Sequence, residues 1–303
     1  MSTSVNEANC ILPGLKDPVD NFPTPVSRMT PAQPVIKIRP ASFWEGIDFA
    51  ELWAHREVLY FLMWRDIKVR YKQTILGAGW VVLQPVLMTV VFAVFLGKLI
   101  RVPSDGVPYP IFAYSGLLLW TFASNAILSS CYSLVTNSQI ITRIYFSRML
   151  IPTAAVGVRL VDLIIAAGML IALLFYYRVP LSLSFLLLPL FLVQIGLLAL
   201  AIGILGSALN VRYRDVGTLA PILLQVWMFA SPLVYSSSIV PARLHMLYSI
   251  NPLVGIIDGF RAALFNLPIP WTSISVSALV TIPLLVFSIH VFRELESTFA
   301  DDV

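Results

Sequence analysis

Residues 65–80 read RDIKVRYKQTILGAGW, and they mark the point where a charged segment gives way to an apolar one. Four positive side chains and one negative side chain lie within residues 65–72, and no charged residue follows until Lys98. The uncharged run 73–97 is 25 residues long, and a helix needs about 20 apolar residues to cross the hydrocarbon core of a bilayer. The sequence therefore predicts a first membrane-spanning helix near residues 75–97, directly preceded by a basic segment.

The composition places the whole chain among integral membrane proteins. Of its 303 residues, 58% are hydrophobic and 12% are charged, and the mean hydropathy is +0.84. A soluble domain carries about 25% charged residues, so this chain could not cover a soluble surface. Further apolar runs predict five more spans, near residues 111–134, 153–176, 184–209, 216–236 and 271–292. We therefore expect an all-α integral membrane protein with six transmembrane helices within residues 46–303.

The basic residues set the predicted orientation. With six spans, the N-terminal segment, the loops near 135–152 and 210–216, and the C-terminus share one side of the membrane. That side holds 15 of the 20 Lys and Arg residues when Arg159 is counted with it. Because loops on the cytoplasmic side are enriched in Lys and Arg, we expect both termini to be cytoplasmic.

Two segments of different character precede the first span. Residues 1–45 hold seven of the 21 prolines among small polar residues, which predicts a mobile cytoplasmic tail. Residues 49–72 have a broad apolar and aromatic face opposite basic side chains, although Arg56 and Arg70 intrude on that face and Leu62 leaves it. This pattern indicates an amphipathic helix at the membrane interface, and a soluble helix packed on other protein is the alternative.

The segment between the fifth and sixth predicted spans is unusually apolar for a loop. Residues 237–270 include the stretches LVGII and AALF, which are too short to span, and Pro252, Asp258 and Arg261 interrupt them. Short helices that enter the membrane part of the way fit this pattern, because such backbone is tolerated where protein buries it or where it lines a cavity. We expect two short re-entrant helices within about 239–266, and one further pair of spans is the alternative.

The chain carries no sequence motif for covalent or nucleotide chemistry. G-x-x-x-x-G-K-[ST], H-E-x-x-H and G-x-S-x-G are all absent from it, and its His and Cys residues are scattered. Proton-coupled transporters normally carry ionisable residues inside their spans, and here only Arg159 and Asp162 qualify. Their i,i+3 spacing predicts an intramembrane ion pair, and a role in opening a pathway is the alternative. We expect no metal or cofactor in this chain, and a transporter that draws its energy from a partner.

A partner would dock on a cytoplasmic segment, and residues 137–152 are the candidate. They read NSQIITRIYFSRMLIP, with two arginines among apolar and aromatic residues between the second and third predicted spans. The segment is either an interfacial connector or a short helix seated in the groove of a partner, with Tyr145 and Phe146 as anchors.

Six stretches, in order, resemble the membrane subunit of bacterial polysaccharide-export ABC transporters. This family exports O-antigen, capsule and teichoic acid and belongs to the type-2 ABC exporter superfamily. The stretches are RDIKVRYKQTILGAGW followed by QP at 65–85, NSQIITRIYFSRMLIP with Arg148 and Pro152, NVRYRD at 210–215, ASPLVYSSSIVP at 230–241, INPLVGIIDGFRAAL at 250–264 and FRELESTFAD at 292–301. The resemblance covers about residues 50–303 and does not extend to the tail.

The resemblance implies a homodimer that works with two copies of a separate ATP-binding subunit, which holds ATP and magnesium. It implies a coupling helix near 137–147 that contacts this subunit. The candidate coupling residues are Asn137, Ile141, Arg143, Tyr145, Phe146 and Arg148. It also implies that the two short helices form a re-entrant gate, with the candidates Asn251, Pro252, Asp258 and Arg261.

The resemblance further implies a channel for a lipid-linked glycan at the dimer interface, lined by aromatic side chains in some members. The candidates in this chain are Tyr114, Trp120, Phe122, Trp227, Phe229 and Tyr235, and ordinary packing or contact with lipid is the alternative role for each. The basic end of the interface helix is the predicted surface where an anionic lipid pyrophosphate arrives. Its candidate residues are Arg65, Lys68, Arg70 and Lys72.

We therefore predict the channel-forming permease subunit of an ATP-driven exporter that moves a lipid-linked cell-surface polysaccharide across the bacterial cytoplasmic (inner) membrane. Its expected partners are the second copy, the ATP-binding subunits, the glycan and membrane lipids, and no nucleic acid. A related exporter of a small lipid or drug is the first alternative, and a membrane-embedded transferase is the second. The basic residues 65–72 and the re-entrant pair disfavour the drug exporter, and the scarcity of acidic residues disfavours the transferase.

Overall fold

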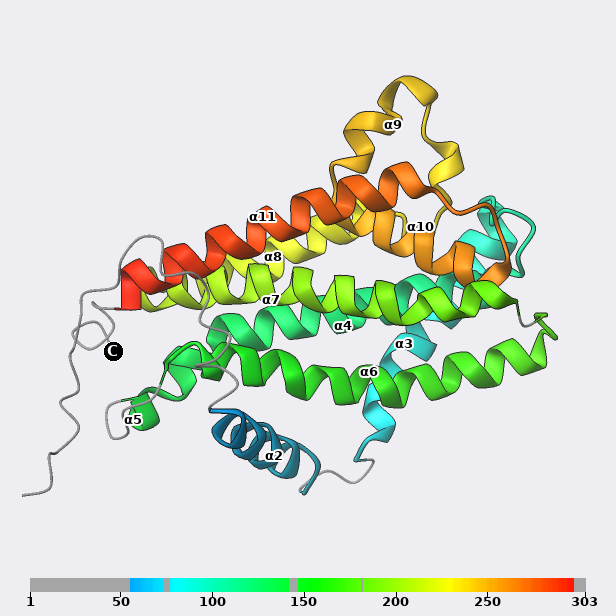
Figure 1. Ribbon diagram of the computed structural model, residues 1–303. Coiled ribbons are helices and arrows are strands. Elements are labelled where there is room, and N and C mark those ends of the chain that lie inside the picture. The colour runs from blue at the N-terminus through cyan, green and yellow to red at the C-terminus, as the bar shows by residue number, and fades with distance from the viewer. Residues whose placement is uncertain (1–54, 73–76, 142–146, 181, 297–303) are drawn as a thin grey trace, which may run out of the picture. The chain divides into compact units, whose positions relative to one another are not determined.

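The computed structural model describes residues 55–72, 77–141, 147–180 and 182–296, all within the unit formed by residues 47–303. Figure 1 shows these residues as helices and their connections, and none of them forms a strand. The predicted tail at 1–45 lies outside the described residues. The all-α prediction is confirmed for the part of the chain that the structure describes.

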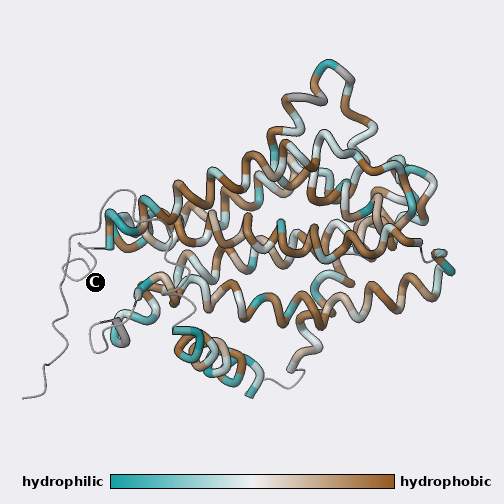
Figure 2. Tube along the Cα trace, viewed as in Figure 1, coloured by the Kyte–Doolittle hydropathy of each residue, from teal (hydrophilic) through white to brown (hydrophobic). Residues whose placement is uncertain are grey.

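Within the described residues, five helices are long and apolar enough to cross a membrane. They are α3 (Gly79–Phe92) continued by the π-helix η1 (Ala93–Ile100), α4 (Tyr109–Thr136), α6 (Leu150–Tyr176), the 3-10 helix η2 (Leu183–Leu187) continued by α7 (Leu188–Arg212), and α11 (Trp271–Glu296). All five begin and end within about four residues of predicted spans. Figure 2 shows hydrophobic residues along most of their length and hydrophilic residues near many of their ends. The chain is therefore a multi-pass membrane protein.

The fifth predicted span is shorter in the structure than the sequence suggests. We predict a span near 216–236, whereas α8 (Asp215–Phe229) has 15 residues, which extend about 22 Å. Pro232 disfavours helical geometry in the residue before it and cannot donate a backbone hydrogen bond. The carbonyl groups of Pro232 and Leu233 accept hydrogen bonds from Arg261 instead of from a continuing helix. The six-span topology stays a prediction.

Helix α4 lies at the centre of the bundle, packed between α6 and α7. Of its most apolar 18-residue stretch, 78% is buried, compared with 11% for the same measure in α3 and η1. The close approach of α4 and α7 needs a glycine, because a Cβ atom on Gly203 would lie 2.6 Å from the Cβ of Ser130. Helix α4 is thus the most buried span, with α3, α6 and α7 packed on it, whereas α11 packs on α7.

Short helices lie toward the two ends of the long helices (Figure 1). Helices α2 (Arg56–Lys72) and α5 (Ser138–Ile141) lie toward the end where α6 begins and α11 ends. Helices α9 (Ala242–Ser249) and α10 (Pro252–Phe265) lie toward the opposite end, between α8 and α11 in the chain. Two short helices therefore occupy the segment predicted to be re-entrant, and their depth in a membrane stays a prediction.

Helix α2 contacts the bundle through a face that coincides only in part with the apolar face that the sequence suggests. Its buried residue is Leu62, which leaves the predicted face, whereas Tyr60 and Trp64 on that face are 67% and 47% exposed. Met63 packs against α6, where a Cβ atom on Gly157 would lie 2.7 Å from the Met63 Cε atom. The helix therefore seats Leu62 and Met63 against the bundle and leaves Tyr60 and Trp64 on its open side.

Candidate functional site

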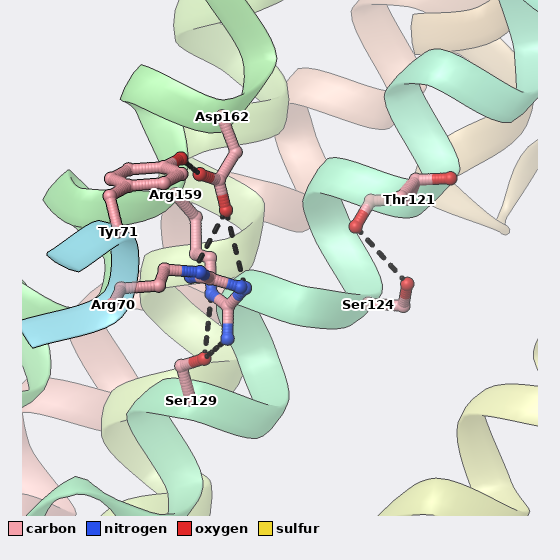
Figure 3. Close-up of polar contacts among 7 residues, drawn as sticks. All are labelled: Arg70, Tyr71, Thr121, Ser124, Ser129, Arg159 and Asp162. Atoms are coloured by element: carbon pink, nitrogen blue, oxygen red, sulfur yellow. Dashed lines mark hydrogen bonds and ion pairs between the residues drawn. The ribbon is translucent and has the colours of Figure 1, made fainter. Parts of the chain in front are cut away.

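A group of polar side chains joins α2 to α4 and α6, and we call it the Asp162 cluster (Figure 3). Its members are Arg70, Tyr71, Ser129, Arg159 and Asp162. The Arg159 Nη1 atom lies 3.2 Å from the Asp162 Oδ2 atom, which gives the ion pair expected from the i,i+3 spacing on α6. The Arg70 Nη1 atom, on α2, lies 3.1 Å from the same oxygen atom. One carboxylate oxygen therefore faces two guanidinium groups.

Two further hydroxyl groups hold Asp162 and Arg159 in place. The Tyr71 hydroxyl donates a hydrogen bond to Asp162 Oδ1. Burial, and then this hydrogen bond, raise the pKa of Tyr71 to about 12, so the phenol remains a neutral donor near neutral pH. The Arg159 Nε and Nη2 atoms donate to the Ser129 hydroxyl at 2.8 and 2.5 Å. The cluster thus ties the end of α2 to α6 and α4.

The Asp162 cluster lines a cavity of about 160 Å³ between α2, α3, α4 and α6. Arg70, Tyr71, Arg159 and Asp162 contribute its charged and phenolic wall. Further polar lining comes from Gln84, Thr121 and Asn125, and apolar lining includes Trp80, Leu118 and Leu163. The cavity is therefore lined by cations, by hydrogen-bonding groups and by hydrocarbon.

The four cations predicted to receive an anionic lipid do not form one patch in the structure. Arg70 belongs to the cluster, and it is the one of the four that lines this cavity within the described residues. Arg65 donates to Asp66 at 2.8 Å and to Asn137 Oδ1 at 2.8 Å. The Lys68 Nζ atom lies 5.1 Å from the ring centroid of Trp64, which suits a cation–π contact. Exposed Lys72 ends the helix, so the four cations have four different environments.

The two ends of the predicted coupling segment each contact another helix. At its start, the Asn137 side chain accepts the hydrogen bond from Arg65 of α2. At its end, the Arg148 Nη1 atom donates to the Glu296 carbonyl oxygen of α11 at 2.7 Å. The side chain of Ile141 and all of Arg143, Tyr145 and Phe146 lie outside the described residues. What the structure describes is therefore how the segment is anchored.

The six predicted channel aromatics divide into buried and less buried residues. Three are buried in the core of the chain: Tyr114, Trp120 and Phe122. The Tyr114 hydroxyl donates to the Ala166 carbonyl oxygen at 2.8 Å, and the Trp120 ring meets Trp227 edge-on at 6.1 Å between centroids. Phe122 also lines the cavity beside the Asp162 cluster, and the channel-lining role of all six stays a prediction. Phe229 is exposed, and Tyr235 donates to its carbonyl oxygen at 3.2 Å.

A second arginine site, which we call the Arg261 clamp, joins α10 to α4 and to the turn after α8. Arg261 is 3% exposed and donates to the carbonyl oxygen atoms of Pro232, Leu233 and Phe112 at 2.6, 2.6 and 3.1 Å. Its guanidinium carbon lies 3.6 Å from the centroid of the Phe112 ring. A Cβ atom on Gly116 would lie 2.6 Å from both Arg261 Nη2 and the Leu233 oxygen, so the clamp needs glycine there.

The other predicted gate residues have defined positions at α10. Asn251 is the N-cap: its Oδ1 atom accepts from the Leu253 backbone N–H at 3.1 Å and from Trp227 Nε1 at 3.0 Å. Pro252 is the first helical residue, where its missing N–H costs nothing. Asp258 lines a second cavity, of about 260 Å³. Asn251 and Pro252 therefore begin the helix, and the gating role stays a prediction.

Comparison with known proteins identifies the family. Residues 57–265 match the family described as ABC-2 type transporter. The chain belongs to the ABC-2 type transporter family. The matched residues include both the Asp162 cluster and the Arg261 clamp.

Individual relatives of this ABC-2 type permease agree with the resemblance found in the motifs. The chain is 26% identical to the O-antigen export system permease protein RfbA of Klebsiella pneumoniae over 246 residues, which are 81% of this chain and 94% of the relative. It is also 26% identical to the protein of that name in Myxococcus xanthus over 258 residues, 84% of this chain and 98% of the relative. The expected family is thereby confirmed.

Several residues of the ABC-2 type permease enter these sites without having been predicted there. The sequence could have indicated a role for Tyr71, because this residue directly follows Arg70 at the basic end of α2. Nothing in the sequence indicated the contacts of Ser129 and Glu296, because their partners Arg159 and Arg148 lie 30 and 148 residues away along the chain. Contacts of that separation depend on how the helices pack.

Proposed function

We propose that this ABC-2 type permease is the membrane subunit of an ATP-driven exporter that moves a lipid-linked cell-surface polysaccharide across the bacterial inner membrane. The observation that carries the proposal is the similarity, over 81–84% of the chain, to permeases named for O-antigen export. The relatives match along 94–98% of their own length, so the likeness extends over nearly the whole of each.

The proposed assembly is a homodimer with two ATP-binding subunits, which supply ATP and magnesium, and with both termini in the cytoplasm. The ATP-binding subunit contacts the segment near 137–147. Contacts at the ends of this segment support a mechanical link, because Asn137 is bonded to Arg65 of α2 and Arg148 to Glu296 of α11. A displacement of the segment would pull on both helices.

The same chain of contacts continues from α2 into the bundle. Arg70 and Tyr71, at the end of α2, both bind Asp162 on α6. A movement of α2 would therefore be transmitted to α6, and through Ser129 to α4. In this proposal ATP hydrolysis moves α2 against the bundle, beside the surface where the anionic lipid carrier arrives.

The test is reconstitution of the full chain in proteoliposomes with and without its ATP-binding subunit, with translocation of a lipid-linked glycan as the measurement. We expect translocation that requires ATP and both subunits. Translocation by this chain alone would overturn the proposal. Export of a small lipid or drug with no export of glycan would overturn it in favour of the alternative exporter.

A second test addresses the coupling segment. The double variant Tyr145→Ala/Phe146→Ala should reduce co-purification of the ATP-binding subunit at least tenfold, because aromatic anchors dominate such contacts. The matched control is Phe175→Ala/Tyr176→Ala, an exposed aromatic pair at the opposite end of α6, which should leave the yield of complex unchanged. Equal yields from both variants would identify the segment as a connector.

A further inference from the structure

We propose that the cavity beside the Asp162 cluster binds the phosphate group of a lipid, with Arg70 and Arg159 as its phosphate ligands. The ligand chemistry is a phosphate ester on an apolar chain. Two lipids supply it: the polyprenyl carrier of a glycan, and a bulk anionic phospholipid. The inference rests on the proposed function only where the carrier lipid is taken as the occupant.

The first argument is charge. The charged side chains that line the cavity are Arg70, Arg159 and Asp162, which leaves one positive charge in excess. Both guanidinium groups approach the same carboxylate oxygen, at 3.1 and 3.2 Å, so Asp162 compensates them incompletely. An uncompensated charge among membrane helices is costly because the surroundings have a low dielectric constant. A bound anion would remove that cost.

The second argument is the supply of hydrogen-bond donors. In the part of the chain that the structure describes, the Nε and Nη2 atoms of Arg70 have no hydrogen-bond partner, and its side chain is 33% exposed. The side chains of Thr121 and Asn125, on the α4 wall, are likewise without a partner among the described residues. A guanidinium fork with neighbouring hydroxyl and amide groups suits the tetrahedral oxygen atoms of a phosphate.

The third argument is the apolar part of the lining, which distinguishes a lipid phosphate from free phosphate. Trp80, Val81 and Pro85 of α3 and Leu118 of α4 line the same cavity. Trp80 is exposed, and the apolar surface of α3 to which it belongs is mostly unburied. Tryptophan is favoured at the level of lipid headgroups. The site therefore places a phosphate position next to a surface on which a hydrocarbon chain can lie.

The test measures lipid binding to the purified full-length protein by native mass spectrometry, without ATP and without the ATP-binding subunit. The probes are farnesyl phosphate, dioleoylphosphatidylglycerol, dioleoylphosphatidylcholine and inorganic phosphate. We expect at least one of the two anionic lipids to bind more than tenfold more tightly than phosphatidylcholine or inorganic phosphate. Tighter binding of farnesyl phosphate identifies the carrier class, and tighter binding of phosphatidylglycerol identifies bulk phospholipid. Equal binding of all four probes overturns the proposal.

The decisive variant is Arg70→Gln/Arg159→Gln/Asp162→Asn, which removes the excess charge without leaving an unpaired one. It should weaken binding of the anionic lipid more than tenfold, because hydrogen bonds to charged groups are the strong ones. The matched control is Arg212→Gln/Arg214→Gln, two exposed arginines outside the cavity, which should bind within about twofold of the unmodified protein. Equal binding by the triple variant and the unmodified protein overturns the proposal.

A milder variant keeps the inference testable if the triple variant does not fold. Asn125→Ala leaves every ion pair intact and should weaken lipid binding about fivefold, the effect of one lost hydrogen bond. Binding unchanged in Asn125→Ala together with a folding defect in the triple variant counts against the site. Loss of glycan export with normal lipid binding would refute the proposed function alone, and the converse would refute this inference alone.

Discussion

The Arg261 clamp and the Asp162 cluster both hold arginine inside the bundle, and they satisfy it by different means. Arg261 is 3% exposed and gives its N–H groups to three backbone carbonyl oxygens and its face to Phe112. Arg70 and Arg159 have side chains that are 33% and 18% exposed, and they share one carboxylate beside a cavity.

The difference separates a fixed contact from an exchangeable one. Backbone carbonyl groups cannot leave Arg261 unless the turn after α8 or the start of α4 comes apart. A side-chain carboxylate can be replaced by another anion, because the arginines keep access to the cavity. The clamp is therefore a structural element of the fold, whereas the cluster has the properties of a binding and coupling element.

The largest expected effect is at the clamp. Arg261→Met should destabilise the protein by about 3–5 kcal/mol, because three buried carbonyl groups would lose their donors. The measurement is the yield of monodisperse protein in detergent and its thermal unfolding midpoint. Arg243→Met, an exposed arginine on neighbouring α9, should leave both unchanged. Equal stability of the two variants would remove the distinction between clamp and cluster.

The next effect tests the close packing around the clamp. Gly116→Ala should cost about 1–3 kcal/mol, because the new methyl group would lie 2.6 Å from Arg261 Nη2 and from the Leu233 oxygen. Gly168→Ala on α6 is the control, since a Cβ atom there has no neighbour within 4 Å. Thermal unfolding of both variants measures the difference. If Gly116→Ala were as stable as the control, Arg261 and the Leu233 carbonyl group would be able to shift at little cost, which contradicts close packing of the clamp.

A smaller effect is expected at the cluster. Asp162→Asn should destabilise the protein by about 1–2 kcal/mol, because the partial exposure of Arg70 and Arg159 reduces, but does not remove, the cost of leaving them without a carboxylate. The loss should be local: hydrogen exchange should increase in α2 and stay unchanged in α10. Uniformly faster exchange in both helices would show that the cluster is as structural as the clamp.

The smallest effect is at Tyr71. Tyr71→Phe should cost about 1 kcal/mol, the value of one hydrogen bond. Burial and Asp162 raise the pKa of Tyr71 from 10.0 to about 12, so this contribution is fully present below pH 10 and is lost as the pH rises through about 12. The difference in unfolding midpoint between the two proteins should therefore be constant from about pH 6 to 9. A difference that changes within this range would assign the effect to another group.

Much of the fold could be predicted because the bilayer imposes a local requirement. A span needs about 20 predominantly apolar residues, and α4, α6 and α11 meet this requirement where the sequence predicts spans. The end of α8 was harder to predict, because the chain after α8 is held by a hydrogen bond from Arg261 to the Pro232 carbonyl oxygen, and these residues are 29 positions apart along the chain. The sequence pattern also could not predict which face of α2 packs on the bundle, because a helix can direct apolar side chains toward lipid or toward protein.

The sequence by itself determined the class of protein, five spans, the family motifs and the contact between Arg159 and Asp162, whose spacing brings them together on one helix. Only the tertiary structure decided that Arg70 joins this pair and that Arg261 reaches Phe112, which is 149 residues away. The physical reason is that pairing between helices depends on their rotation and contact. In a membrane protein an apolar pattern on every face does not specify either.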